Sequence, residues 1–263
     1  MKIPAPITGM RSFLSATEPF ANVTPYSSSE TISWYDGAGN PRERQVGPKC
    51  NDIDLVSAQR SRDTNRYQYK RNYEGNYWCA GTGGHVWYES MTEYSAIMHL
   101  DHTSRLAALT AQPCCIRFKD GTQHYPDFYA EHHDGRKVLY DVRPLKFMDE
   151  KTQHVFSRTA EVCDSIGWGY EIIHEIGRVE RHNLEWLAAY RHPWNAPHPE
   201  TVDQIAAFVS EPRPLEHVAQ LLHFVRPAKF IHHVYHLMWQ QQLSYDNRLP
   251  ISWETELIWN PDA

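Results

Sequence analysis

Cysteine is scarce in this chain of 263 residues, which contains only five. The five are odd in number, scattered, and never spaced as C-x-x-C, so the sequence disfavours both a disulfide framework and a cysteine zinc site. This cysteine usage is typical of a protein in a reducing compartment. Pro4 and Pro6 interrupt the segment in which a secretory signal needs an unbroken apolar stretch, and we therefore expect a cytoplasmic protein.

Long hydrophobic runs and an excess of positive charge are also missing. No segment approaches the roughly 18 consecutive apolar residues of a membrane-spanning helix, so we expect no membrane partner. Apolar residues still make up 41% of the chain, which is enough to build a core and excludes an extensively disordered protein. Lys and Arg number 26 against 32 Asp and Glu, and the net charge of −6 argues against a broadly basic, nucleic-acid-binding surface.

One segment, residues 59–73, departs from this charge balance. Its only acidic residue is Asp63, and tyrosines alternate with its basic residues. Such a segment suits DNA, because Arg and Lys contact phosphates while aromatic rings pack or stack. A solvated loop with its tyrosines packed against the core has the same composition, and both interpretations stay open. The candidate DNA-binding residues in this segment are Arg60, Arg62, Arg66, Lys70 and Arg71.

Hydrophobic periodicity and turn residues predict an α/β core over residues 89–178. The predicted elements are a helix at 89–100, strands at 114–118, 123–132 and 137–142, a helix at 152–166 and a strand at 170–176. Tight turns at 119–121 and 134–135 join the first three strands as hairpins. We expect residues 1–88 to wrap this core as an extension of loops and short strands.

A charged helix and a proline-rich linker, residues 179–198, separate this core from a C-terminal domain of residues 199–263. The domain contains three short helical patterns followed by a candidate hairpin. They cover residues 200–210, 214–223 and 227–241, with strands at 243–245 and 249–252. Three small helices and a hairpin predict a winged-helix domain.

Acidic residues of the central hairpin are the candidate catalytic group. Asp127 and Asp141 are equally distant from Asp134 in the turn, so antiparallel pairing brings them side by side. Arg143 shares the strand face of Asp141, and Glu93 on the preceding helix adds a third carboxylate. Because carboxylates hold Mg²⁺ and phosphodiester hydrolysis uses such an ion, this group predicts a metal site for cleaving nucleic acid.

These residues resemble the PD-(D/E)xK nucleases, and the surrounding sequence is similar to the TnsA endonuclease family of heteromeric transposases. The motifs that carry the resemblance are Y-E-S-M-T-E at 88–93, A-Q-P at 111–113, Y-P-D-F at 125–128, D-V-R-P at 141–144 and N-L-E-W-L at 183–187. The resemblance extends over residues 60 to 255. Each motif alone is moderately specific, whereas the ordered set is much more so.

The resemblance implies a restriction-endonuclease-like core followed by a winged-helix domain. It implies a Mg²⁺-dependent enzyme, with Mn²⁺ as a substitute, that cuts one strand of double-stranded DNA at transposon ends. An integrase-type transposase subunit would cut the other strand, and an AAA+ ATPase regulator would bind the C-terminal domain. The implied metal ligands are Glu93, Asp127, Asp141 and the backbone carbonyl of Val142. Glu89 is the rival of Glu93, because residues four apart share a helical face; the spacing from Glu93 to Gln112 suits the family better.

The chain departs from the general nuclease motif at Arg143, where the motif has Lys. Arg is not deprotonated in proteins, so Arg143 is expected to hold a phosphate and stabilise charge rather than act as a base. Lys146 is the nearest lysine that can contribute in its place. This departure motivates a second hypothesis, a non-catalytic DNA-binding or scaffold subunit that retains the nuclease fold. A stand-alone restriction or repair nuclease is the third.

Overall fold

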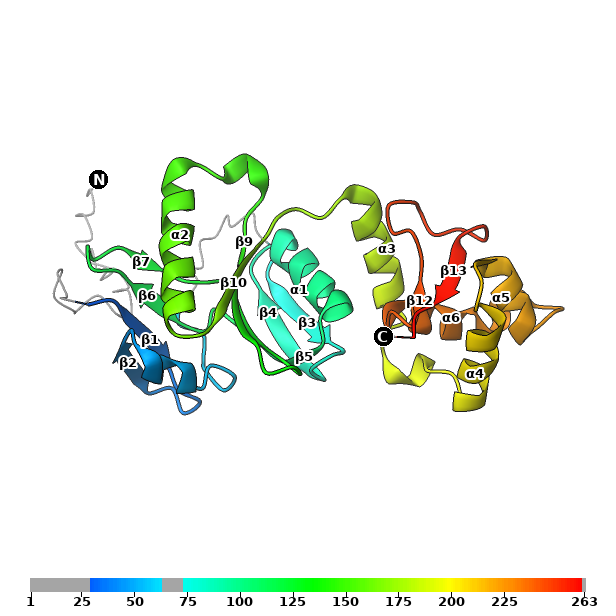
Figure 1. The fold of residues 1–263 in the computed structure, drawn as a ribbon, viewed down its shortest axis with the longest axis horizontal. Coiled ribbons are helices and arrows are strands. Elements are labelled where there is room, and N and C mark those ends of the chain that lie inside the picture. The colour runs from blue at the N-terminus through cyan, green and yellow to red at the C-terminus, as the bar shows by residue number, and fades with distance from the viewer. Residues whose placement is uncertain (1–28, 63–72, 262–263) are drawn as a thin grey trace, which may run out of the picture.

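The computed structural model describes residues 29–62 and 73–261 of the chain. Helices and several small sheets alternate along an elongated molecule, with the N-terminal strands at one end and the last helices at the other (Figure 1). The predicted α/β class is confirmed at this level. None of the helices in the described ranges is long and apolar enough to span a membrane.

A four-stranded mixed sheet lies at the centre of the molecule. Its strand order is β10 (Gly169–Ile173), β9 (Lys137–Val142), β8 (Phe128–His132) and β5 (Leu106–Ala111). β9 and β10 run parallel, and the crossover that joins them contains α2 (Glu150–Ser165), as parallel neighbours require. The other two pairs are antiparallel.

Helices cover this sheet on both faces. Phe128 and Tyr140 belong to one buried cluster together with Ile97 of α1 (Met91–Thr103). Tyr129 and Leu139, the next residues on the same strands, belong to a second cluster with α2. Successive side chains of a strand point to opposite faces of the sheet, so β8 and β9 contribute alternate residues to the two clusters.

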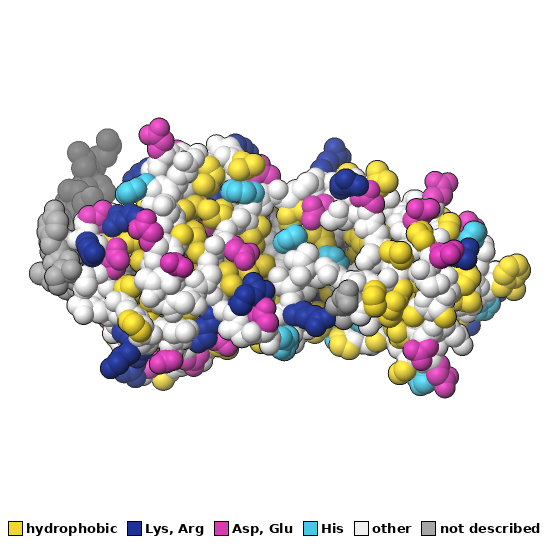
Figure 2. Space-filling model, viewed as in Figure 1, with side chains coloured by type: hydrophobic (Ala, Val, Ile, Leu, Met, Phe, Trp, Pro, Cys, Tyr) yellow, Lys and Arg dark blue, Asp and Glu magenta, His cyan; other side chains and the backbone are white. Residues whose placement is uncertain are grey.

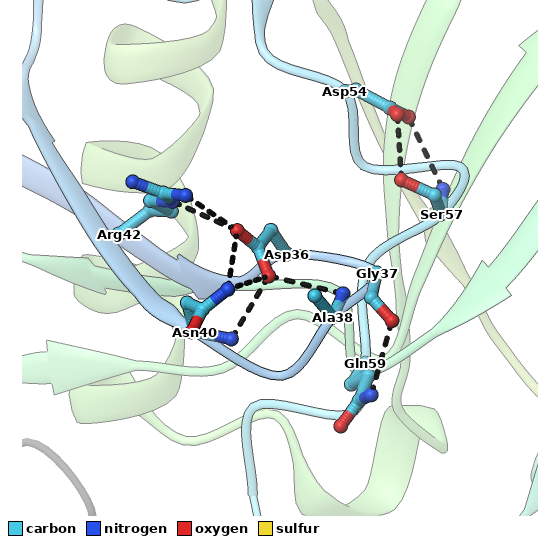
Figure 3. A network of polar contacts seen from close by, with 8 residues as sticks. All are labelled: Asp36, Gly37, Ala38, Asn40, Arg42, Asp54, Ser57 and Gln59. Atoms are coloured by element: carbon cyan, nitrogen blue, oxygen red, sulfur yellow. Dashed lines mark hydrogen bonds and ion pairs between the residues drawn. The ribbon is translucent and has the colours of Figure 1, made fainter.

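An N-terminal sheet adjoins the second cluster. Its order is β2 (Pro41–Gln45), β1 (Thr31–Tyr35), β6 (Cys115–Arg117) and β7 (Gln123–His124), with the short 3-10 helix η1 at Pro48–Asp52. Asp36 closes the β1–β2 turn, because its carboxylate accepts hydrogen bonds from the Asn40 backbone at 2.9 Å and from Arg42 Nε at 2.9 Å (Figure 3). These bonds lower the pKa of Asp36 to about 2.

The segment that leads to the basic residues is fastened to this turn. The backbone N–H of Gln59 donates to the Tyr35 carbonyl at 3.0 Å. The Gln59 side chain donates to the Gly37 carbonyl at 3.3 Å, as Figure 3 shows. Asp54 accepts a hydrogen bond from the Ser57 hydroxyl at 2.6 Å within the same segment. The backbone that reaches Arg60 therefore has a fixed position.

Several strands of the described chain were not expected as separate elements, among them three in the first half of the chain. β3 (Gly75–Cys79) and β4 (Gly84–Tyr88) form a hairpin that packs against α1. β5 (Leu106–Ala111) lies between the helix predicted at 89–100 and the strand predicted at 114–118, where no element was expected. The helix α1 ends at Thr103, beyond the predicted end at residue 100, because Ser104 has an extended backbone and its N–H donates to the Leu100 carbonyl.

The strand predicted at 123–132 is wrong as a single element. Its first two residues form β7 in the N-terminal sheet, and its last five form β8 in the central sheet. Pro126 lies in the gap, where the missing backbone N–H prevents a continuous ladder. The chain changes sheets immediately before Asp127.

The C-terminal part contains four α-helices and a small sheet. The helices are α3 (Arg178–Ala188), α4 (Pro199–Phe208), α5 (Leu215–Leu222) and α6 (Ile231–Trp239), with 3-10 helices η3 at Pro193–Asn195 and η4 at Pro227–Phe230; the remaining 3-10 helix of the described residues after β9, η2 at Leu145–Phe147, precedes α2 in the central part. The sheet has the order β11 (Arg213–Pro214), β13 (Glu256–Trp259) and β12 (Leu243–Ser244).

The return strand predicted at 249–252 is wrong, since β12 pairs with β13 instead. The side chain of Asn183 explains the difference. It donates to the carbonyls of Asn247 and Leu249 at 3.2 and 2.8 Å and accepts from the backbone N–H of Ile251 at 3.1 Å. This segment therefore satisfies its backbone against α3 and not in a β-ladder.

Candidate functional site

The central hairpin has the predicted register. Phe128 pairs with Tyr140 across β8 and β9, and the next step along both strands places Asp127 opposite Asp141. Gly135 closes the turn with a φ of +86°, a left-handed conformation that glycine adopts without strain. The sequence thus predicted correctly that these two carboxylates meet at one end of the sheet.

Three elements position Asp141, which is 3% exposed. Its Oδ2 accepts a hydrogen bond from the Tyr170 hydroxyl of β10 at 2.5 Å and lies 2.8 Å from His124 Nε2 of β7. Phe156 of α2 packs beside both rings. Burial and the Asp141 carboxylate raise the pKa of Tyr170 well above its usual range, so the hydroxyl stays protonated and donates.

Asp127 is held by backbone groups on both sides. Its Oδ2 accepts from the backbone N–H of Val142 at 2.7 Å, and its carbonyl accepts from the N–H of Gln112 at 2.8 Å. The pKa of Asp127 is raised well above its ordinary value, first by burial and then by the charges of Asp141 and Glu93. An ionised Asp127 is therefore unfavourable unless a positive charge comes close.

Glu93 makes a structural contact in addition to its electrostatic one. Ser90 is the N-cap of α1 and accepts from the Glu93 N–H at 3.2 Å. In return, Glu93 Oε2 accepts from the Glu89 N–H at 2.7 Å and Oε1 accepts from the Ser90 hydroxyl at 3.0 Å. These bonds make a capping box, which holds the Glu93 side chain at the helix start. The Glu89 carboxylate also raises the pKa of Asp127, to a smaller extent.

Of the two cations after β9, Arg143 precedes the turn η2 and Lys146 lies on it. Arg143 Nε donates to the Phe147 carbonyl at 3.2 Å, and its guanidinium lies 5.8 Å from the Phe147 ring. The pKa of Asp149 is lowered mainly by hydrogen bonding with Thr152 and to a smaller extent by the charge of Arg143. The Lys146 ammonium lies 4.8 Å from the same ring. The pKa of Glu175 is lowered first by the hydrogen bond from the Leu145 N–H, and Lys146 makes a minor contribution. In this conformation both side chains contact the turn and not the aspartates.

The fit of a divalent cation to these residues is partial. Within the described ranges, no three His, Cys, Asp or Glu side chains converge with the geometry of a metal site. Asp127 and Asp141 each use only Oδ2 in the hydrogen bonds found among the described residues, which leaves Oδ1 available. The electrostatic cost of ionising Asp127 also favours a cation there. Glu93 can bind the same cation only after its carboxylate leaves the N-cap of α1.

The basic segment approaches the site at its N-terminal end. The Ser61 N–H donates to the Gln112 carbonyl at 2.9 Å, and Gln112 in turn donates to Asp127. The Arg60 guanidinium, next in the chain, lies 4.1 Å from the ring of Trp87. Arg60 and Arg62, on either side of Ser61, are exposed. The other three predicted cations, Arg66, Lys70 and Arg71, lie outside the described residues.

Sequence reasoning missed the contribution of Tyr170 and the contact of His124 with Asp141. Tyr170 pairs with Leu139 in parallel β10, which puts it on the sheet face of Asp141. That register depends on the crossover connection and has no local sequence signal. His124 is close to Asp127 in sequence, but the change of sheet at Pro126 directs it to Asp141.

Comparison with protein-family models finds no match for this chain, and comparison with curated proteins also finds none.

Proposed function

We propose that this protein is a metal-dependent DNA endonuclease subunit of a heteromeric transposase, which cuts one strand at transposon ends. The observation that carries the proposal is the pair Asp127 and Asp141, opposite each other at the end of the hairpin, with the pKa of Asp127 raised by burial and by its acidic neighbours. The ordered motifs shared with TnsA-like proteins support the reaction class. They also support a restriction-endonuclease-like core for residues 89–178.

The proposed roles follow from the placement of each group. Bound Mg²⁺, or Mn²⁺, would polarise the scissile phosphate and lower the pKa of a water molecule. Asp127 and Asp141 would hold the ion through Oδ1, together with the Val142 carbonyl, and Glu93 would join them on leaving the cap. Arg60 and Arg62 would bind flanking phosphates. Arg143, just before the turn η2 next to the site, and Lys146, on that turn, would contact the DNA backbone after reorientation.

The C-terminal part is proposed to be a winged-helix domain that binds protein. Three helices, α4 to α6, followed by paired strands support this assignment. Phe224 and Val225 are 82% and 80% exposed, and apolar side chains gather at this end of the molecule (Figure 2). Acidic and basic side chains are mixed over the face in this view, which suits a protein partner better than a DNA groove. The proposed partner of this domain is the AAA+ regulator. The integrase-type transposase is the second proposed partner of the protein, and both are proposed to bind it in the cytoplasm.

The test is cleavage of DNA carrying a transposon end by the complete transposase mixture, with Mg²⁺ or EDTA. We expect Asp127→Asn to abolish the cut that this subunit makes and to leave the partner's cut intact. Asp164→Asn, at an exposed aspartate of α2, is the matched control and keeps full activity. Wild-type cleavage by Asp127→Asn would contradict the proposed site.

The second candidate is a non-catalytic scaffold subunit. The engagement of Glu93 in the helix cap and of Arg143 with Phe147 favours it. Calorimetry separates the two functions: absence of Mn²⁺ binding that depends on Asp127 and Asp141, even with DNA bound, would favour the scaffold. Cleavage by the purified chain without partners would instead favour a stand-alone nuclease.

A further inference from the structure

The β3–β4 hairpin presents two tryptophans on its outer face. Its register pairs Asn76 with Trp87 and Trp78 with His85, so these four side chains share one face. The alternate residues Tyr77 and Val86 are buried in the cluster that contains α1. The hairpin thus has one face in the core and an opposite aromatic face on which Trp78 and Trp87 are half-buried, with Trp87 also packed against the edge of the core.

Side chains from two other segments complete this face. Arg60 stacks on Trp87 at 4.1 Å from one side. From the other side, His192 stacks on Trp78 with centroids 4.9 Å apart, and Trp194 stacks on His192 at 3.3 Å. We call this row the aromatic strip; its members are Arg60, Trp78, His85, Trp87, His192 and Trp194.

The far end of the aromatic strip is held in place by Arg191. Its Nε donates to the Trp78 carbonyl at 3.0 Å, its guanidinium lies 4.8 Å from the Tyr77 ring, and it also donates to the Ala188 carbonyl. Trp194 beyond it is 76% exposed. An indole whose orientation is fixed by a stacked neighbour and whose surface is open is prepared to receive another ring.

The near end of the aromatic strip adjoins the candidate catalytic residues. Arg60 precedes Ser61, which is fully buried and hydrogen-bonded to Gln112, the neighbour of Asp127. No member of the strip is acidic, although the whole chain carries a net charge of −6. The strip therefore combines aromatic rings with one fixed positive charge, that of Arg60, which lies at the end that leads to the carboxylates.

We propose that the aromatic strip binds single-stranded DNA next to the cleavage site, with a base stacked on Trp194 and phosphates held by Arg60. The proposal rests on the proposed nuclease function and specifies the form of its substrate. Bases of a duplex have their faces covered by neighbouring base pairs, whereas an unpaired strand offers them to aromatic side chains. The positive charge of Arg60 favours a nucleic acid over an apolar protein segment.

The experiment measures binding of a fluorescein-labelled oligothymidine of about 15 nucleotides, a length that covers a typical single-strand site, by fluorescence anisotropy in EDTA. We expect Trp194→Ala to weaken binding about tenfold, as loss of one stacked base does, and Trp194→Phe to retain most of the affinity. Trp253→Ala is the matched control, because Trp253 is 45% exposed and lies outside the strip. Arg60→Gln should reduce the salt dependence, which Trp194→Ala should leave unchanged.

Unchanged oligothymidine affinity in Trp194→Ala would overturn the proposal. So would a Trp194→Ala variant that binds DNA normally but no longer binds the transposase subunit, since the strip would then be a protein interface. If the nuclease assignment is wrong, the cleavage assay gives a different result: DNA cleavage by the transposase mixture does not depend on Asp127. The binding assay contains no divalent metal and is independent of that outcome.

Discussion

The Tyr170 hydroxyl donates a hydrogen bond to Asp141 Oδ2 at 2.5 Å, from a strand that reaches β9 only through the α2 crossover. His124 contacts the same oxygen from a different sheet. Both contacts fix the orientation of the Asp141 carboxylate, and they therefore also fix the direction in which its Oδ1 points. Tyr170 and His124 are therefore positioning residues for Asp141 in the proposed site.

Removal of the Tyr170 hydroxyl tests this relationship. Tyr170→Phe should lower the free energy of unfolding by about 1–2 kcal/mol, because one hydrogen bond to a buried carboxylate is lost. DNA cleavage should fall about tenfold or more, as it does when the group that orients a metal ligand is removed. The measurements are chemical denaturation and the Mn²⁺ concentration that gives half-maximal cleavage.

Tyr129→Phe is the control for Tyr170→Phe. Tyr129 is also a buried tyrosine, and its hydroxyl donates to Glu131 Oε1 at 2.8 Å on the same sheet, away from Asp141. It should lose comparable stability and keep normal cleavage and Mn²⁺ dependence. If both variants cleave equally well, Tyr170 has only a structural role.

Asp127→Asn should stabilise the protein at about pH 8 while it removes the proposed activity. The native pKa of Asp127 is raised, so its contribution to stability is fully present below the unfolded value of about 3.9 and is lost as the pH rises through the native pKa. Asn resembles the protonated form and still accepts from the Val142 N–H. Thermal unfolding in EDTA should show a higher midpoint for the variant.

The same measurement with Mg²⁺ or Mn²⁺ tests the metal. A cation that binds the native site raises the unfolding midpoint of the wild type, and Asp127→Asn should lose this response. Asp164→Asn should retain it. Equal stabilisation of all three proteins by the cation would show that Asp127 is not a ligand.

Substitutions of Glu93 separate its two contacts. Gln also fits a capping box, so Glu93→Gln should keep the stability of α1, whereas Glu93→Ala should lose about 1 kcal/mol. If Glu93 also binds the metal, Glu93→Gln reduces cleavage about a hundredfold despite normal folding. Glu89→Gln is the companion variant, and a larger loss there would make Glu89 the third acid. Denaturation and nicking rates give both results.

The hairpin and its two aspartates could be predicted because their signals are local. An Asp-Gly turn fixes the register, and β-branched and aromatic residues continue on both sides of it. The other contacts of the site depend on groups far apart in the chain. Tyr170 reaches Asp141 through a parallel pairing, and Ser61 reaches Gln112 across the sheet edge. Neither contact has a sequence pattern of its own.

Single residues explain where the predicted elements were wrong. Pro126 divides one apparent strand between two sheets, and Asn183 holds the segment that looked like a return strand. Gln112 has a φ of +46°, an unusual value for a residue other than glycine, which residue type alone does not indicate. Periodicity detects the elements, whereas such residues determine how the elements are joined.

His102 gives a prediction for the pH dependence of folding. Its Nδ1 donates to the Trp239 carbonyl at 2.8 Å and joins α1 to the end of α6. Burial lowers the pKa of His102 to about 4, with opposing effects from the Trp239 carbonyl and from Asp101 and a further decrease from His99. The unfolded chain therefore binds a proton more tightly, and this group destabilises the fold as the pH falls from about 6.5 to about 4.

The matched variant is His102→Asn, in which the amide can still donate to the Trp239 carbonyl but does not titrate. We expect the wild type to lose up to about 3 kcal/mol more stability than the variant across that pH range, as a shift of this size implies. His198→Asn, at an exposed histidine, should follow the wild type. Burial also lowers the pKa values of His99, His132 and His236, so the variant should retain part of the acid sensitivity. Parallel denaturation profiles for wild type and His102→Asn would contradict the assigned role, because His102 would then remain as easily protonated in the fold as in the unfolded chain.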